Sequence, residues 1–541
     1  MDDHGSAGEQ QVGDNRSHRE QADSRLPGRA PTRAATVAWR RGLAPCLAFA
    51  GLLSAFACTA APALPPAAHG PLTLTIGLPQ SRQLDPRRGA PAAADILSFE
   101  RLTTSDAEGR TKPRLLEGWS VAGDGLTWTL RVRRDVRFQD GAPLTAADVK
   151  RTFDTAAANP AIRGISVCLP DLASVAAPSD HDVVITLSRR CSYLLDDFDR
   201  AVSRMAADGK TRVGTGAFSI TSSSPDAIVL EANRHYHGGP PAIDRVIVKP
   251  FGALRAAWAD MMRGEVDFLW EVGPDTAEFL NDPAAFEVRS FLGYYASALM
   301  LNSAKPPFRR AEVRRAFNLA VDREAIVQQA LKGHGLAADG PIWPRYWARD
   351  PRAAAVPFDP AGAEALLRDA RQGPIEFTCI VPANFSILER TALIAQQQLG
   401  AIGVRMQLAS LPPDAFNQRI VSGHFDAAVL SVLGGPSATV FHRLWHSAGE
   451  TARWNFWGYR NARVDAALDE ARNAASDEEF SGAIRRFEAA ARDDPPAIFL
   501  AWNQTVQAVS RRFVVPGDQA GRDAIYALDR WRPNYSARAA Q

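Results

Sequence analysis

The sequence has few cysteines and no large excess of charge of either sign. The first feature argues against common metal and redox sites, and the second against a polyanion-binding protein. Five cysteines occur in 541 residues and none forms a Cys-x-x-Cys pair, so zinc ribbons and thioredoxin-type redox sites are unsupported. Lysine and arginine number 62 against 60 aspartates and glutamates, which gives a formal net charge of +2. This balance leaves no sequence-wide positive field to hold nucleic acid or an anionic membrane surface. We therefore expect no nucleic-acid partner.

Familiar catalytic signatures are absent as well. The chain contains no Gly-x-Ser-x-Gly elbow, no Walker loop and no His-Glu-x-x-His sequence, which mark serine hydrolases, nucleotide hydrolases and zinc proteases. The paired acids Asp196-Asp197 and Asp493-Asp494 lie beside loops without a partner base, so we expect them to be solvated. These absences predict a protein that is not an enzyme and that carries no cofactor.

The first 58 residues have the pattern of an export signal region. Residues 1–41 are polar and end in two arginines, and an apolar run follows at 42–57. A charged segment before an apolar run of about 15 residues is typical of an export signal, and no later stretch approaches the ~18 apolar residues of a membrane helix. We expect a periplasmic or cell-surface protein; the alternative is an N-terminal membrane helix. Cys58 is a candidate for lipidation, although Phe56 replaces the small residue usual at that point.

Three cysteines remain beyond this region: Cys168, Cys191 and Cys379. Strand-like residues on both sides of a turn at 178–181 predict a hairpin. Cys168 and Cys191 are equally distant from the centre of that turn, so pairing of the two strands would place them opposite each other. We predict a disulfide between them; the alternative is two unrelated buried thiols.

Strand and helix signals alternate along the rest of the chain. Leu74, Ile76 and Leu78 alternate with Thr and Gly and predict a first strand. Residues that commonly cap helices predict helix starts at Thr145, Asp322, Asp359 and Ser476. Residues 498–502 and 506–509 are predicted to be two strands that return to an earlier sheet. The pattern is mixed α/β. A chain of 541 residues is too long to fold around a single hydrophobic core, so we expect two or more lobes.

Six segments together resemble a known family. In chain order they are LDP (84–86), LLEGWSVAGDGLTWTLRVRRDVRFQDGAPLTAADV (115–149), GTGAF (214–218), LEANRHYHGGPPAIDRVIV (230–248), GEVDF (264–268) and PPFRRAEVRRAFNLAVDREAIV (306–327). The ordered set resembles the extracellular solute-binding proteins, family 5, which serve peptide, opine and nickel ABC importers. The resemblance covers nearly all of the chain after the export signal region.

The resemblance implies a two-lobed α/β periplasmic-binding-protein fold, of the class II, cluster C type. After the signal region at 1–58, it assigns 70–95, 207–290 and 492–541 to lobe I, 96–206 to an extra subdomain inserted in lobe I, and 291–491 to lobe II. Chain crossings between two such lobes form a hinge, and closure buries the ligand between two faces.

The resemblance also implies where a ligand binds. In peptide-binding relatives, the segment that matches 425–439 pairs its backbone with an extended peptide, and an acid there holds the peptide's ammonium. In this sequence the acid falls at Gly435, and the Trp usual just before it falls at Val432. Because a desolvated ammonium needs a fixed counter-charge, we expect a blocked, modified or non-peptide ligand rather than a peptide with a free N-terminus.

Predicted ligand-binding residues come from these matched segments and from aromatic side chains near the expected cleft. Aromatic rings supply flat apolar walls with a polar edge, and the alternative for each ring is ordinary core packing. The predicted set is Tyr294, Tyr295, Ser431, Val432, Leu433, Gly434, Trp454, Asn455 and Trp502.

Two histidines four residues apart, His442 and His446, would share one face of a helix. That spacing can chelate a transition metal. No carboxylate or cysteine lies nearby in the sequence, so we expect no metal site. A nickel or metal-chelate carrier remains an alternative function.

These observations predict the solute-binding component of an ABC importer. We expect a monomer that captures a peptide-like or other small solute and delivers it to a permease and its ATPase. Contact with the membrane would come through the permease or through a lipid on Cys58. The alternative from another class is an exported sensor or peptide chaperone with the same fold and no transporter.

Overall fold

The computed structural model describes residues 71–79, 89–273, 282–448, 454–519 and 521–535. The predicted export signal region, with Cys58, lies outside these residues. Across the described ranges, helices that are both long and apolar enough for a bilayer are absent. The mixed α/β pattern expected from the sequence is confirmed.

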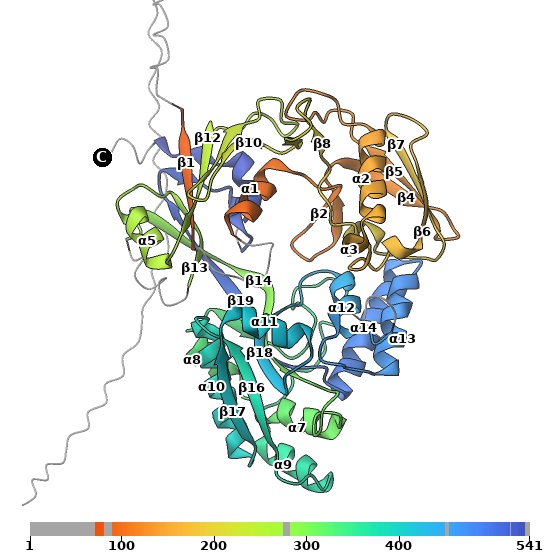
Figure 1. The fold of residues 1–541 in the computed structure, drawn as a ribbon, viewed down its shortest axis with the longest axis vertical. Helices are drawn as coiled ribbons and strands as arrows, with labels where there is room; N and C mark the ends of the chain where they lie inside the picture. Colours follow the sequence, from red (N-terminus) through yellow and green to blue (C-terminus); the bar gives the residue numbers. More distant parts are fainter. Residues whose placement is uncertain (1–70, 80–88, 274–281, 449–453, 520, 536–541) are drawn as a thin grey trace, which may run out of the picture. The chain divides into compact units, whose positions relative to one another are not determined.

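The largest sheet has eleven strands in the order β10-β11-β12-β1-β13-β19-β14-β18-β16-β17, with β15 paired to β19 (Figure 1). Its strands are β1 (Thr73–Pro79), β10 (Phe218–Ser223), β11 (Ile228–Ala232), β12 (Arg245–Phe251), β13 (Phe268–Val272), β14 (Phe286–Leu301), β15 (Gly335–Ala337), β16 (Glu376–Pro382), β17 (Arg405–Leu411), β18 (Ala427–Leu433) and β19 (Ile498–Ser510). β1 pairs in parallel with β12 and β13, and β16 in parallel with β17 and β18. β14 and β19 pair antiparallel and lie between these two parallel groups.

β14 and β19 carry the chain from one half of the sheet to the other. The last residues of β19 pair with β13, whereas its first residues pair with β15 and with the part of β14 that also pairs with β18. The ends of β19 belong to different hydrophobic clusters: Val509 packs with Leu74 and Val248, and Leu500 packs with Phe317 and Leu399. We therefore propose that both lobe boundaries lie inside these strands. A boundary at 492 precedes β19 and would separate its first residues from the lobe in which they pack.

The C-terminal return differs from the sequence prediction in one respect. The two strands predicted at 498–502 and 506–509 form one continuous strand, β19. The polar residues between them keep cross-strand partners, since Asn503 pairs with Gly335 and Gln504 with Leu292. Because these residues are paired through their backbone, the strand continues although the apolar pattern stops there.

We assign the helices to the two proposed lobes, and those predicted to begin after Asp322, Asp359 and Ser476 do so. In lobe I they are α1 (Ala90–Ser98), α5 (Leu254–Met262) and the 3-10 helix η4 (Ala524–Arg530). In lobe II they are α7 (Ala311–Ala320), α8 (Arg323–Ala330), α9 (Pro360–Asp369), α10 (Ser386–Ala401), α11 (Pro413–Val421), α12 (Ala438–Trp445), α13 (Ala462–Asn473) and α14 (Asp477–Asp493). The side chains of Asp322, Asp359 and Ser476 accept hydrogen bonds from first-turn amides at 3.0, 2.8 and 3.2 Å. Each satisfies an N–H group that the helix leaves unpaired.

An insert that begins at 96 would cut α1, which ends at Ser98, so we begin it after this helix. Residues 99–206, which we call the insert, contain a sheet of their own. Its order is β4-β5-β7-β6, formed by β4 (Leu116–Val121), β5 (Thr127–Val132), β6 (Leu172–Ala176) and β7 (Asp182–Leu187). Its other elements include β2 (Thr103–Ser105), β3 (Thr111–Pro113), α2 (Ala146–Ala158), α3 (Pro160–Arg163) and α4 (Leu194–Asp197), while β8 (Arg204–Met205) pairs with β9 (Arg212–Val213) outside the insert. Cys168 and Cys191 form a disulfide at the base of the β6–β7 hairpin, with a Cα–Cα distance of 5.8 Å. This is the pairing that the spacing predicts.

The insert packs on both lobes. Gln139 donates hydrogen bonds to backbone carbonyls of α1 and β10 in lobe I, at 3.0 and 2.8 Å. On its other side, Phe153 and Tyr193 belong to the same buried hydrophobic cluster as Phe441 and Trp445 of lobe II. The insert therefore connects the two lobes through contacts, in addition to the strands that cross between them.

Candidate functional site

The candidate site lies where β14 leaves its pairing with β19. The register of the two strands shifts between Leu292 and Ala296, so that Gly293, Tyr294 and Tyr295 form a bulge. Trp343 fixes this bulge by donating its Nε1 hydrogen to the carbonyl oxygen of Gly293 at 3.1 Å, and its ring packs edge-on against Tyr294. Bulges commonly redirect side chains at binding sites. Here the bulge sits on the strand that joins the lobes.

Two glycines that follow β18 lie against this bulge. The amide of Gly434 donates to the carbonyl oxygen of Tyr294 at 2.9 Å. A Cβ atom on Gly435 would lie 2.4 Å from Cβ of Tyr294, closer than real Cβ contacts allow. Tyr294 thus fills the space into which an acidic side chain at 435 would extend. The packing of Tyr294 therefore leaves no room for the acidic side chain that the sequence lacks at position 435.

One edge of β18 is available for pairing at the site. β18 pairs with β14 from Ala427 to Leu433, but it pairs with β16 only at Ala427 and Ala428. From Val429 onward, its second edge pairs with no strand in the described part of the chain. Ser431 is exposed, Leu433 is half-buried and Val432 is buried. An extended backbone could add to this edge by β-augmentation.

A segment near the C-terminus supplies residues that the sequence did not identify. Tyr294 lies within electrostatic range of Arg522 and Asp523, and Tyr526 within range of Tyr294. Arg522 also reaches the backbone oxygen of Ser105 in the insert at 3.5 Å. The sequence carries no local signal for these residues, because their nearness to Tyr294 depends on how β19 returns the chain to lobe I. We call Tyr294, Tyr295, Gly434, Gly435 and Tyr526 together the crossing site.

Tyr294 and Tyr526 of the crossing site are accessible to solvent. Tyr294 is 40% exposed and Tyr526 is 58% exposed. Burial nevertheless raises the pKa of Tyr294, with Arg522 opposing that shift and Asp523 adding to it. Burial also raises the pKa of Tyr526 to about 12. Both phenols can therefore be reached by a solute, while the protein around them disfavours their ionised forms.

The carboxylate of Asp523, close to Tyr294, already accepts hydrogen bonds from the protein itself. Asp523 accepts hydrogen bonds from Trp270 at 3.0 Å and from Gln507 at 2.8 Å, and it caps η4 by accepting from the amide of Ile525 at 3.1 Å. Burial raises the pKa of Asp523, although these donors oppose the rise. Asp523 therefore acts first as a structural acceptor.

Three of the residues predicted to bind the ligand have contacts other than those of the crossing site. Trp502 is fully buried, and its ring lies 2.4 Å from the position of a Cβ on Gly434, so it supports the glycine from below. Asn455 exchanges hydrogen bonds with the backbone of Tyr459 at 2.7 and 2.9 Å and so holds a local turn. Trp454 is partly exposed, and among the described aromatic rings it lies near Phe456. The structure therefore brings together Tyr294, Tyr295 and the end of β18, with Trp502 as support.

Polar contacts between the insert and lobe II correct one expectation. Asp196 and Asp197 are not merely solvated: Ser437, which directly precedes α12, donates to Asp196 at 2.5 Å, and Arg443 of α12 donates to Asp197 at 2.8 Å. Asp197 is buried and also accepts from the amide of Cys168 at 2.9 Å. Burial raises the pKa of Asp196 to about 7, although the Ser437 hydroxyl lowers it. The sequence does not reveal the lobe II partners of this acidic pair, because they lie more than 200 residues away.

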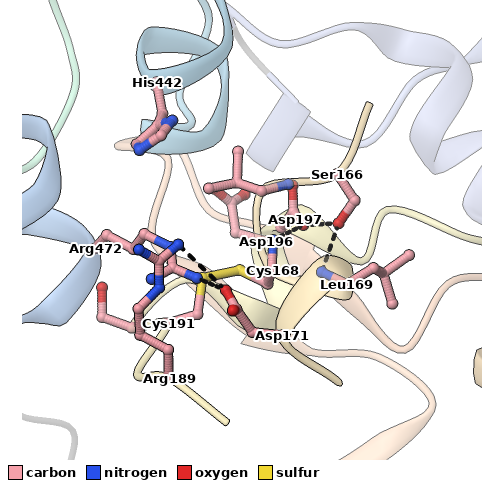
Figure 2. Close-up of a disulfide and its surroundings, with 12 residues drawn as sticks. Ser166, Cys168, Leu169, Asp171, Arg189, Cys191, Asp196, Asp197, His442 and Arg472 are labelled. Atoms are coloured by element: carbon pink, nitrogen blue, oxygen red, sulfur yellow. Dashed lines mark hydrogen bonds and ion pairs between the residues drawn. A yellow bond between two sulfur atoms is a disulfide. The ribbon is translucent and has the colours of Figure 1, made fainter. Parts of the chain in front are cut away.

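Arg472 makes a second connection between the insert and lobe II (Figure 2). Its guanidinium pairs with Asp171 next to the disulfide, and the amide of Ser192 donates to its backbone oxygen at 2.8 Å. The arginine is almost fully buried, so the pair is shielded from screening by salt. The disulfide fixes the insert segment on which this contact depends.

Comparisons with known proteins agree with this architecture. A family model described as "Bacterial extracellular solute-binding proteins, family 5 Middle" matches residues 110–452. The chain is 26% identical over 353 residues to the probable D,D-dipeptide-binding periplasmic protein DdpA of Escherichia coli (strain K12), covering 61% of this chain and 68% of DdpA. It is 27% identical over 424 residues to the glutathione-binding protein GsiB of Pectobacterium atrosepticum, covering 74% of this chain and 81% of GsiB.

A solved structure shows the fold. The oligopeptide-binding protein AppA from Bacillus subtilis, in complex with a nonapeptide, matches with a TM-score of 0.69 at 21% identity. The match covers 86% of this chain and 100% of AppA. The predicted two-lobed fold is therefore confirmed.

Proposed function

Because the chain belongs to the bacterial extracellular solute-binding proteins, family 5, we propose that it is the exported solute-binding component of an ABC importer. It captures a peptide-like or other small solute at the crossing site and delivers it to the membrane permease. It catalyses no reaction. The names of DdpA and GsiB and the nonapeptide bound to AppA support a peptide-like ligand.

The observation that carries this proposal is the bulge on β14. A solute at Tyr294 would contact the strand that joins the lobes, beside Gly434 of lobe II and Tyr526 of lobe I. A ligand that touches both lobes binds their closed arrangement better than their open one and so shifts the equilibrium toward closure. The permease would then recognise the closed protein.

The chemistry of the crossing site favours a ligand without a free ammonium. Tyr294 occupies the space of an acid at 435, and the nearby carboxylate of Asp523 is already hydrogen-bonded to Trp270 and Gln507. A buried ammonium without a counter-charge loses much of its affinity. The free edge of β18 still offers backbone donors and acceptors to an extended chain.

A matched pair of ligands tests this proposal. Tripeptide libraries with free and with acetylated N-termini are titrated into the stripped protein by calorimetry. We expect the acetylated member of a binding pair to bind at least as tightly as the free one. We expect Tyr294→Ala to weaken binding at least tenfold and Tyr535→Ala, a more exposed tyrosine, to leave it unchanged.

Two results would oppose the proposal. A free peptide that binds ten times tighter than its acetylated form would show that an ammonium pocket exists. If wild-type protein and Tyr294→Ala bound every ligand with equal affinity, the solute would not bind at the crossing site.

A further inference from the structure

Two imidazoles and a carboxylate meet on adjacent helices of lobe II. His442 lies on α12, His446 follows its last turn, and Asp469 lies on α13. The two rings are stacked, with centroids 4.5 Å apart and planes 3° from parallel. Nε2 of His442 lies 3.8 Å from Oδ1 of Asp469, and Nε2 of His446 lies 3.5 Å from Oδ2. One ligand atom from each residue falls within 4.8 Å of the others.

The imidazole nitrogens that face this cluster are unsatisfied. His442 is 5% exposed, and among the described residues neither of its ring nitrogens has a hydrogen-bond partner. Nε2 of His446 also lacks one within the same ranges. Buried polar atoms without partners are rare and call for an explanation. Figure 2 shows His442 extending from its helix on the side of Arg472.

The second nitrogen of His446 is oriented by the backbone. Nδ1 lies 2.9 Å from the carbonyl oxygen of Ala448 and 3.1 Å from its amide. These contacts hold the imidazole in place, and its other nitrogen, Nε2, is the atom that approaches Asp469. Metal-binding histidines in proteins are commonly fixed in this way.

An ion pair alone does not account for the arrangement. Both nitrogen–oxygen distances to Asp469 are 3.5 Å or longer, beyond a good charge-assisted hydrogen bond. Two stacked imidazolium rings would also repel each other, so at least one lone pair stays free for another partner.

We propose that His442, His446 and Asp469 form a binding site for a late first-row transition-metal ion such as Zn²⁺. Ligand atoms around a tetrahedral zinc ion, with bonds of about 2.0–2.1 Å, lie about 3.3 Å apart, so small side-chain rotations would close the present distances. Imidazole nitrogens exclude Ca²⁺ and Mg²⁺ as the natural occupants. The half-exposed side chain of Asp469 leaves the fourth position open to water.

The surrounding charges suit a cation. Asp465 lies within electrostatic range of His446 and adds a second negative charge beside that of Asp469. Arg472 lies near His442, but its charge is paired with Asp171. All three ligands come from helices of one lobe, so the ion would stay bound whether the lobes are open or closed. It would be a resident ion and not the transported solute.

The ion would also affect the contact with the insert. α12 carries Arg443, which binds Asp197, and α13 carries Arg472, which binds Asp171. A metal that joins α12 to α13 fixes these two arginines relative to each other. Metal binding should therefore stabilise the insert–lobe II contact.

Calorimetric titration of ZnCl₂ into the chelator-treated, tag-free full chain tests the site, with Co²⁺ substitution as a spectroscopic readout of ligation. Asp469→Asn removes a half-exposed ligand and should leave the fold intact. Glu470→Gln is the matched control, because it removes the same charge from the next residue of α13, where Glu470 pairs with Arg486 at the surface. His442→Gln removes an imidazole while retaining side-chain volume.

We expect one zinc ion per chain and a higher melting temperature on its addition. Asp469→Asn should weaken binding at least tenfold, His442→Gln should abolish the Co²⁺ spectrum of the site, and Glu470→Gln should bind as the wild type does. Tyr294→Ala should keep full zinc binding, which separates this site from the crossing site. A wild-type chain that binds no zinc, or an Asp469→Asn variant that binds as tightly as Glu470→Gln, would overturn the proposal.

Discussion

Asp196 should make the stability of this protein depend on pH in a direction opposite to that of an ordinary salt-bridged acid. Its pKa is raised from 3.8 to about 7 by burial against lobe II, where Ser437 donates to it. A folded pKa above the unfolded one means that the folded state holds the proton more tightly. The contribution of Asp196 is therefore complete below about pH 4 and is lost as pH rises through 7.

The magnitude follows from the shift. About three pH units at 1.36 kcal/mol each correspond to roughly 4 kcal/mol in total, of which about 3 kcal/mol is lost between pH 5 and pH 8.5. Asp196→Asn mimics the protonated acid and removes the titration. The stability difference between variant and wild type should grow in favour of the variant by about 3 kcal/mol over that interval.

Chemical denaturation at pH 5.0 and pH 8.5 measures the free energy of unfolding of the wild type and of Asp196→Asn. Asp180→Asn, which changes an exposed carboxylate in the turn between β6 and β7, is the control and should follow the wild type at both values. If Asp196→Asn and wild type change in parallel with pH, Asp196 ionises as it does in the unfolded chain and our description of the insert–lobe II contact is wrong.

The remaining predictions concern the disulfide and the crossing site. Replacing Cys168 and Cys191 together by alanine removes a link between residues 23 apart, and should lower the free energy of unfolding by about 3 kcal/mol in denaturant titrations; an unchanged midpoint would contradict this. Gly435→Ala should displace Tyr294, since the added Cβ would lie 2.4 Å from it, and should weaken solute binding at least tenfold by calorimetry. Gly373→Ala, where a Cβ meets open space, should bind solute normally, and equal losses in both variants would refute the packing argument.

Local features of the fold could be predicted from the sequence. Helix caps such as Asp322 and Ser476 depend on neighbouring residues only, and the positions of Cys168 and Cys191 around one turn were enough to predict their pairing. The two-lobed fold followed from an ordered set of segments that resemble one family. The break predicted inside β19 failed because cross-strand pairing to β14 and β15, which no local pattern reveals, outweighs the polar residues there.

The parts of the sites that depend on distant segments could not be predicted. Tyr526 reaches the crossing site only because the chain returns to lobe I. Asp469 lies 23 residues beyond His446 and comes close to it through the packing of α12 on α13. The sequence argument against a metal rested on the lack of a nearby acid, and the fold supplies that acid.

The central claim is that two lobes joined by β14 and β19 close on a solute and leave it chemically unchanged. Small-angle scattering of the stripped protein, with and without a solute found by calorimetry, tests closure, and mass spectrometry of the solute released afterwards tests its integrity. We predict a smaller radius of gyration with solute bound and an unaltered solute mass. A scattering profile that does not change on saturation, or a released molecule of different mass, would contradict the account.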